Sequence, residues 1–152
     1  MKKYIYSSLL IFAFFLLFAC AGGPKFSDVS GKEWKLVEVK KQPESIKFDR
    51  NTLVSEGFAN IFTLNFDAER LSGIGAPNRY STPYELGKKQ AITVKEVAST
   101  LMAPLREPEK LKENEFFACL RNIYMWNINS GGQLELLSKG DDGREVTLIF
   151  EL

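Results

Sequence analysis

The chain has 152 residues, with 20 Lys and Arg side chains against 19 Asp and Glu, so its formal net charge is +1. A balance this close to neutral offers no broad positive field for nucleic acid. The sequence contains no histidine, which removes the most common general base, pH switch and zinc ligand. The length is sufficient for one domain with a substantial core.

Residues 1–19 have the features of a secretory signal peptide. Two lysines precede a largely apolar stretch at residues 5–18, which is shorter than a typical membrane span. This stretch ends in Leu17-Phe18-Ala19-Cys20, which resembles a bacterial lipobox. We therefore expect cleavage before Cys20, lipidation of that cysteine and export to the bacterial cell envelope. Ala21 follows the cysteine, and a non-acidic residue there permits sorting to the outer membrane.

Two alternatives to a lipoprotein remain open. The small residues around Cys20 also satisfy the rule for ordinary signal cleavage, which would give a soluble secreted protein. The segment could instead stay uncleaved as an anchor. A cysteine placed directly after the apolar run, in a chain with two cysteines in all, favours the lipoprotein. Residues 20–30 are then a lipidated tether that connects to a folded domain at residues 31–152.

Removal of the signal peptide leaves 152 − 19 = 133 residues and takes away two lysines, so the net charge becomes 1 − 2 = −1. If Cys20 carries lipid, Cys119 is the one remaining thiol, and the exported domain has no internal disulfide. Cys119 lies beside Phe117 and Leu120 in the sequence, so we interpret it as a small core residue rather than a reactive thiol.

The folded domain consists mainly of short segments in which apolar and polar residues alternate, the pattern of a strand with one buried face. In the first of them, Trp34 and Leu36 are in one phase but Val37 and Val39 are in the other, which predicts a bulge or a twist. Asp67 to Arg70 predicts a tight reversal between two strands, and Pro77 ends the second of these. About eight short strands are expected, from nine candidate segments at residues 33–40, 46–49, 62–67, 71–74, 80–86, 92–102, 124–129, 134–136 and 146–150.

One segment, residues 107–121, has the spacing of an amphipathic helix. Pro108 suits a first helical turn, and acidic neighbours complement the positive end of the helix dipole. Phe116, Phe117 and Leu120 share a face and are expected to point into the core. The predicted fold is therefore of the α+β class, with a curved antiparallel sheet packed on one helix.

Several motifs in this order resemble those of the META-domain family of HslJ-like heat-shock lipoproteins. The resemblance covers nearly the whole mature chain, and the combined order of the motifs is more specific than any one of them. The motifs are Trp34-Lys35-Leu36, Leu64-Asn65-Phe66-Asp67, Gly75-Ala76-Pro77-Asn78-Arg79-Tyr80, Ser99-Thr100-Leu101-Met102-Ala103-Pro104, Glu113-Asn114-Glu115-Phe116-Phe117 and the terminal segment 143–150.

The resemblance implies a non-enzymatic envelope protein without a cofactor that binds another envelope component and acts in stress tolerance or secretion. The family's similarity to pilot lipoproteins implies an alternative, a carrier of an acyl chain or apolar peptide in a cleft between sheet and helix. Two cysteines found in relatives are replaced here by Pro77 and Pro104. Their joint loss implies that the two loops are neighbours, and it excludes a redox role for that pair.

The residues themselves support no catalytic or metal site. Ser72 and Ser99 lack an activating partner and fit ordinary strands. The turn at Asp141-Asp142-Gly143 resembles part of a calcium loop but lacks the spaced ligands and the closing glutamate. We therefore expect neither an enzyme nor a metal protein.

Four polar and aromatic residues are the candidates for a partner-binding surface. Arginine and tyrosine are enriched at protein interfaces, and Asn78, Arg79, Tyr80 and Tyr84 lie close together in the sequence. In the alternative interpretation, Asn78 fixes a turn, Tyr80 packs in the core and Arg79 is a solvated charge.

Overall fold

A computed structural model describes residues 23–152, and the predicted signal peptide and Cys20 lie outside the described residues. None of the helices in the described part is long and apolar enough to cross a membrane. The helical elements are η1 (Phe26–Asp28), α1 (Arg50–Ser55) and α2 (Glu113–Arg121). The strands are β1 (Trp34–Lys41), β2 (Ser45–Lys47), β3 (Thr63–Phe66), β4 (Arg70–Ile74), β5 (Arg79–Leu86), β6 (Ile92–Val94), β7 (Ala98–Ser99), β8 (Met125–Ile128), β9 (Leu134–Lys139) and β10 (Glu145–Glu151).

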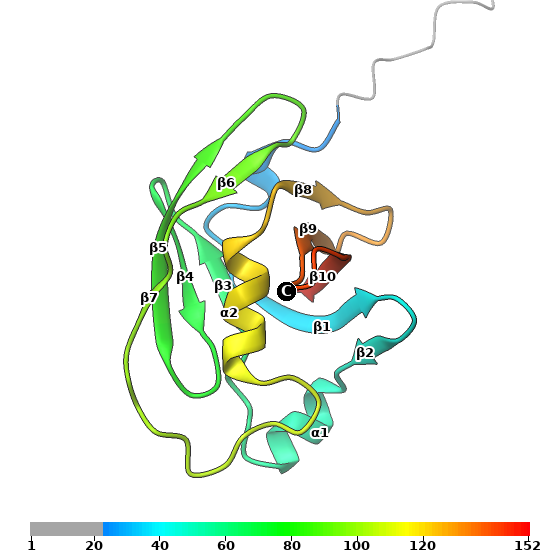
Figure 1. Ribbon diagram of the computed structural model, residues 1–152. Helices are drawn as coiled ribbons and strands as arrows, with labels where there is room; N and C mark the ends of the chain where they lie inside the picture. Colours follow the sequence, from blue (N-terminus) through cyan, green and yellow to red (C-terminus); the bar gives the residue numbers. More distant parts are fainter. Residues whose placement is uncertain (1–22) are drawn as a thin grey trace, which may run out of the picture.

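The strands form one antiparallel sheet that is nearly closed into a barrel around α2 (Figure 1). Its order is β6-β5-β4-β3-β1-β10-β9-β8, while β2 pairs with β1 and β7 pairs with β5. The two edge strands meet, because Ile92 N–H donates to the Tyr124 carbonyl at 3.1 Å and Trp126 N–H donates to the Gln90 carbonyl at 3.0 Å. The prediction of a curved sheet on a helix is confirmed, but the described residues contain ten strands rather than about eight.

The predicted bulge in β1 is present. The pairing of β1 with β10 shifts between Leu36 and Glu38, so Val37 is the extra residue. Trp34 and Leu36 before the shift and Val39 after it are all buried. The bulge therefore turns both phases of the sequence pattern toward one core.

Helix α2 fills the interior of the sheet, but it begins six residues later than predicted. The chain at Lys112 is still extended, and its N–H donates to Glu115 Oε2 at 2.8 Å, which caps the first turn. Pro108 therefore lies in a loop before the helix, with Leu111 buried as an anchor. Phe116, Phe117 and Leu120 are buried as predicted.

Helix α1 lies where a loop was predicted, and the short strand at 46–49 ends at Lys47. Asp49 caps the helix by accepting hydrogen bonds from Asn51 N–H and the Thr52 hydroxyl, both at 2.9 Å. These hydrogen bonds lower the pKa of Asp49, and the bond from the Thr52 side chain has the largest effect. The helix has six residues, of which Leu53 is the buried one, so it is too short for a periodic apolar pattern to reveal it.

Candidate functional site

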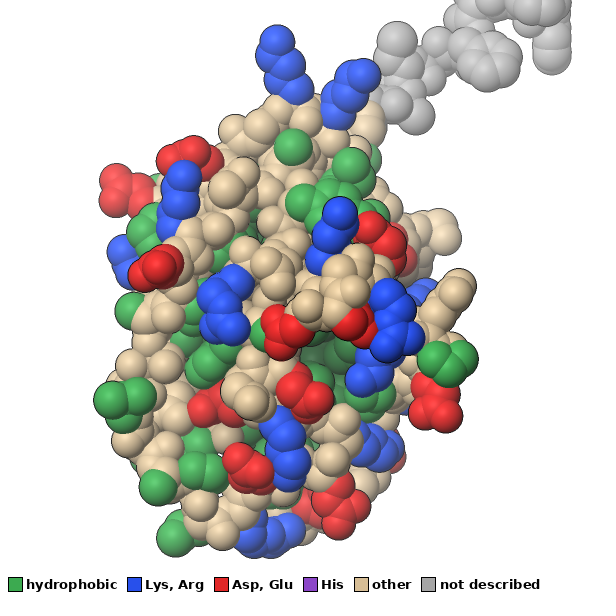
Figure 2. Space-filling view, viewed as in Figure 1, with side chains coloured by type: hydrophobic (Ala, Val, Ile, Leu, Met, Phe, Trp, Pro, Cys, Tyr) green, Lys and Arg blue, Asp and Glu red, His purple; other side chains and the backbone are tan. Residues whose placement is uncertain are grey.

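The most prominent surface feature is an apolar loop, which we define as residues 101–105 (Leu-Met-Ala-Pro-Leu) between β7 and α2. Leu101 is 97% exposed, Leu105 103% and Met102 60%. Hydrophobic side chains project along this edge of the molecule in Figure 2. Single exposed apolar residues are common, but several of them on one loop are a candidate binding surface.

Asn78 fixes the first part of the apolar loop. Its Oδ1 accepts hydrogen bonds from Met102 N–H and the Thr100 hydroxyl, both at 2.7 Å. Its Nδ2 donates to the Met102 carbonyl at 3.1 Å and to Glu113 Oε2 at 2.6 Å. The side-chain amide thus uses both donors and both acceptor positions. The buried Asn78 is a positioning residue that fixes the chain on both sides of Leu101.

Glu113, at the start of α2, completes this arrangement. Its Oε1 accepts hydrogen bonds from Ala76 N–H at 2.5 Å and Asn78 N–H at 2.6 Å. A carboxylate in the first helical turn also complements the helix dipole. Gly75 allows this close approach, because a Cβ there would lie 2.6 Å from Glu113 Oε1. The turn between β4 and β5, the apolar loop and α2 are therefore held as one unit.

The implied proximity of Pro77 and Pro104 agrees with the structure. Both residues line the same hollow, and the two hydrogen bonds between Asn78 and Met102 join their loops directly.

A groove runs beside the apolar loop, and we call it the α1 groove. It consists of two hollows of about 380 Å³ and 320 Å³ that share Glu56, Phe58 and Arg106. One wall comes from residues 48–61, around α1, and the other from residues 102–110. Each hollow has the size of a small ligand site. The apolar lining residues are Phe48, Leu53, Phe58, Ile61, Pro77, Met102, Ala103, Pro104, Leu105 and Pro108.

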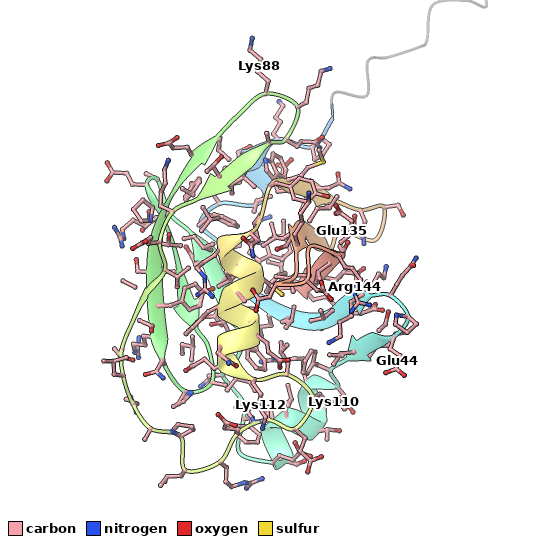
Figure 3. The ribbon with its side chains drawn as sticks, in the orientation of Figure 1. Glu44, Lys88, Lys110, Lys112, Glu135 and Arg144 are labelled. Carbon is pink, nitrogen blue, oxygen red and sulfur yellow. The ribbon has the colours of Figure 1, made fainter. Side chains whose placement is uncertain are left out.

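The charges of the α1 groove are mostly negative. Four acids line it, against the two bases Arg106 and Lys110. The Arg106 guanidinium stacks over the Phe58 ring, 5.3 Å from its centroid. Lys110, which lies beside α1 in Figure 3, donates to the Lys47 carbonyl at 3.0 Å. The acids are Asp49, Glu56, Glu107 and Glu109.

A second cleft of about 390 Å³ lies between α2 and the ends of β1 and β10, and we call it the helix cleft. On this face, Figure 2 shows a hollow with hydrophobic side chains inside and charged side chains at its rim. Val39, Ala118 and Cys119 contribute to its lining. Burial, followed by the nearby Asp141 charge, raises the pKa of the Cys119 thiol to about 11. This thiol is therefore protonated at neutral pH and is a poor nucleophile.

Two of the four residues that were candidates for a partner-binding surface are buried. Asn78 and Tyr80 are buried, with 6% and 3% of their surface exposed, and the Tyr80 hydroxyl donates to the Thr63 carbonyl at 2.8 Å. Tyr84 is half-buried and donates to the Asp67 carbonyl at 2.6 Å, while Arg79 is exposed. The prediction is therefore wrong for Asn78 and Tyr80 as contact residues, because the backbone and Glu113 use their polar atoms.

Sequence reasoning missed the apolar loop, although a signal was present. The run of apolar residues at 101–105 begins inside the strand predicted to end at residue 102, and this pattern favours burial in the core. The short β7 ends at Ser99 instead. Within residues 23–152, no group of three or more His, Cys, Asp or Glu side chains is arranged to hold a metal ion.

Comparisons with known proteins agree with this architecture. The sequence model of the META domain matches residues 27–150. No curated protein matches the sequence significantly. An NMR structure of a protein from Burkholderia xenovorans is similar with a TM-score of 0.58 at 19% identity, over 81% of this chain and 83% of that one. A crystal structure of a DUF4847-family protein from Bacteroides vulgatus gives 0.53 at 14% identity, over 82% and 94%. These two likenesses show the fold alone.

Proposed function

The chain belongs to the META-domain family, and from this membership we propose a non-enzymatic, lipid-anchored envelope protein whose apolar loop binds another envelope component. The observation that carries the proposal is the exposure of Leu101 and Leu105 on a loop whose first part, at Met102, is held in place by Asn78 and Glu113. Burying one leucine against a partner gains about 1.5–3 kcal/mol. A loop that is already ordered loses little entropy on binding, which improves affinity.

The apolar loop lies at the end of the domain opposite the expected lipid anchor, and this position supports a protein partner. The described chain begins near β6 and β8, whereas the apolar loop lies at the opposite end with α1 (Figure 1). Cys20 is three positions before Gly23, where the described chain begins. A lipid on Cys20 would therefore direct the apolar loop away from the anchoring membrane and toward other envelope components.

The double variant Leu101→Ser, Leu105→Ser tests the binding surface. Because both side chains are exposed, we expect the free energy of unfolding to change by less than about 0.5 kcal/mol. Quantitative cross-linking of the full-length protein in intact cells, read by mass spectrometry, should show about a tenfold loss of the partner. Leu86→Ser is the matched control, since Leu86 is 47% exposed at a distant strand end. Equal cross-linking of both variants and the natural protein would overturn the proposal.

The lipid anchor has a separate test. Metabolic labelling with radioactive palmitate should mark the natural protein, and the label should be lost in Cys20→Ala. Cys119 serves as an internal control, because its burial keeps it from substituting for Cys20. Equal labelling of both proteins would exclude lipidation at Cys20.

The helix cleft supports a second candidate function, that of a carrier. Its volume of about 390 Å³ between helix and sheet suits an acyl chain or an apolar side-chain cluster. A carrier would retain co-purified lipid in Leu101→Ser, Leu105→Ser, because the helix cleft does not involve the apolar loop. If this double variant contains no lipid and no longer binds its partner, the result favours a binding protein over a carrier.

A further inference from the structure

We infer that the α1 groove binds a basic, apolar peptide segment of the partner, with an aliphatic or aromatic side chain in the groove and a lysine or arginine at Glu56 and Glu109. The inference rests on the proposed function, because the groove begins at the apolar loop. Met102, Pro104 and Leu105 belong to the apolar loop and also line the hollow next to it. A peptide segment of the partner that contacts the loop can therefore extend into the groove.

The shape of the α1 groove favours an extended segment over a compact ligand. Its two hollows meet at Phe58, Glu56 and Arg106, so a bound molecule that fills both must pass these three residues. The floor is apolar, with Phe58 half-buried and Leu53 and Phe48 buried beneath it. Apolar side chains on alternate positions of an extended peptide would reach the two hollows in turn.

The charges at the rim specify a basic segment. Asp49 is used as the cap of α1, and Glu107 pairs with Lys112 at 3.0 Å. Among residues 23–152, neither Glu56 nor Glu109 forms an ion pair. Both are exposed at the rim of the groove. The two bases of the lining form no ion pair either, but Arg106 stacks over Phe58 and Lys110 donates to the Lys47 carbonyl. Glu56 and Glu109 are therefore the acids that a cation on the ligand would meet.

The same charges argue against a membrane surface as the occupant. Bacterial membranes carry anionic lipids, and an apolar loop that inserts into them is normally flanked by an excess of Lys and Arg. The lining of the groove beside this loop has four acids and two bases, and Lys112 pairs with one of the acids. The groove therefore lacks the excess of positive charge that anionic headgroups attract. The groove therefore fits a basic protein segment.

Selection from a phage library of random dodecapeptides on immobilised full-length protein tests the inference. The natural protein should enrich peptides that combine Lys or Arg with large apolar residues, and Leu101→Ser, Leu105→Ser should not. For synthetic copies of the enriched peptides, Glu56→Gln, Glu109→Gln should raise the Kd about fivefold, since each exposed ion pair contributes modestly. Added salt should weaken binding to the natural protein more than to this variant. Glu69→Gln, Glu96→Gln removes two other exposed charges and should leave the Kd unchanged.

The outcomes distinguish a failure of the basic-segment inference from a failure of the proposed function. Peptides enriched by the natural protein over the loop variant but neutral or acidic in composition would overturn the basic segment and leave the apolar loop as a binding surface. An unchanged Kd for Glu56→Gln, Glu109→Gln would do the same. Equal enrichment by the natural protein and the loop variant, or none by either, would overturn the proposed function and this inference with it.

Discussion

Replacing Gly73 by alanine is expected to destabilise the protein by about 3 kcal/mol or more, enough to leave much of it insoluble on expression. A Cβ on Gly73 would lie 2.0 Å from the Thr63 carbonyl oxygen and 2.8 Å from the Thr63 carbonyl carbon. Both atoms belong to the backbone of β3, next to β4 in the sheet. They cannot rotate away as the end of a flexible side chain could, so the two strands must separate.

The same substitution also removes a buried hydrogen bond. The Tyr80 hydroxyl donates to the Thr63 carbonyl at 2.8 Å and would lie 2.9 Å from the new Cβ. Burial raises the pKa of Tyr80 well above its ordinary value, so the phenol stays neutral. If it loses its acceptor, the buried hydroxyl costs about 1–3 kcal/mol of unfolding free energy.

Urea unfolding of the full-length variants, followed by circular dichroism, measures the effect of Gly73→Ala. Gly131→Ala is the control, because its Cβ would meet a side-chain atom, Asn129 Oδ1, at 3.3 Å and no backbone atom within 4 Å, and we expect a change below about 1 kcal/mol. Adding Tyr80→Phe to Gly73→Ala removes the hydroxyl contact but not the backbone clash, so stability should stay low. Rescue by Tyr80→Phe, or a Gly73→Ala variant as stable as the control, would contradict this explanation.

The sequence alone could predict the elements that follow simple periodicity. The mixed phases of β1 indicated its bulge, and the spacing of Phe116, Phe117 and Leu120 indicated the buried face of α2. The start of α2 could not be predicted in this way, because Pro108 and the acids near it imitate the first turn of a helix. The true start depends on Leu111, which is held in the core, and on the cap at Lys112.

The candidate site was harder to predict than the fold because it depends on contacts between residues distant in sequence. The sequence pattern singles out Asn78 but places it on the surface. Its partners Met102 and Glu113 are 24 and 35 positions away, and no local pattern pairs them. The exposure of Leu101 likewise follows from where Asn78 holds the chain, at Thr100 and Met102. An apolar run in sequence indicates burial unless tertiary contacts prevent it.

Asn78→Asp is expected to destabilise the protein by about 2–4 kcal/mol at neutral pH. The aspartate would place a second carboxylate oxygen where Asn78 Nδ2 now lies, 2.6 Å from Glu113 Oε2. Two carboxylates repel at this distance, and the Met102 carbonyl also loses its donor. The deficit should become smaller as the pH falls, because protonation of one carboxyl group converts the repulsion into a hydrogen bond.

Exchanging the amide and the acid should restore most of the loss. In Asn78→Asp, Glu113→Gln, the new amide on α2 can donate an N–H to the aspartate, and its oxygen can still accept from the backbone N–H groups of residues 76 and 78. Glu113→Gln alone places two amide NH₂ groups against each other and should cost about 1–2 kcal/mol. Urea unfolding of the four proteins gives the coupling energy, which we expect to be favourable by about 1–3 kcal/mol. Additive losses in the double variant would show that the hydrogen bond between Asn78 and Glu113 does not hold the apolar loop in place.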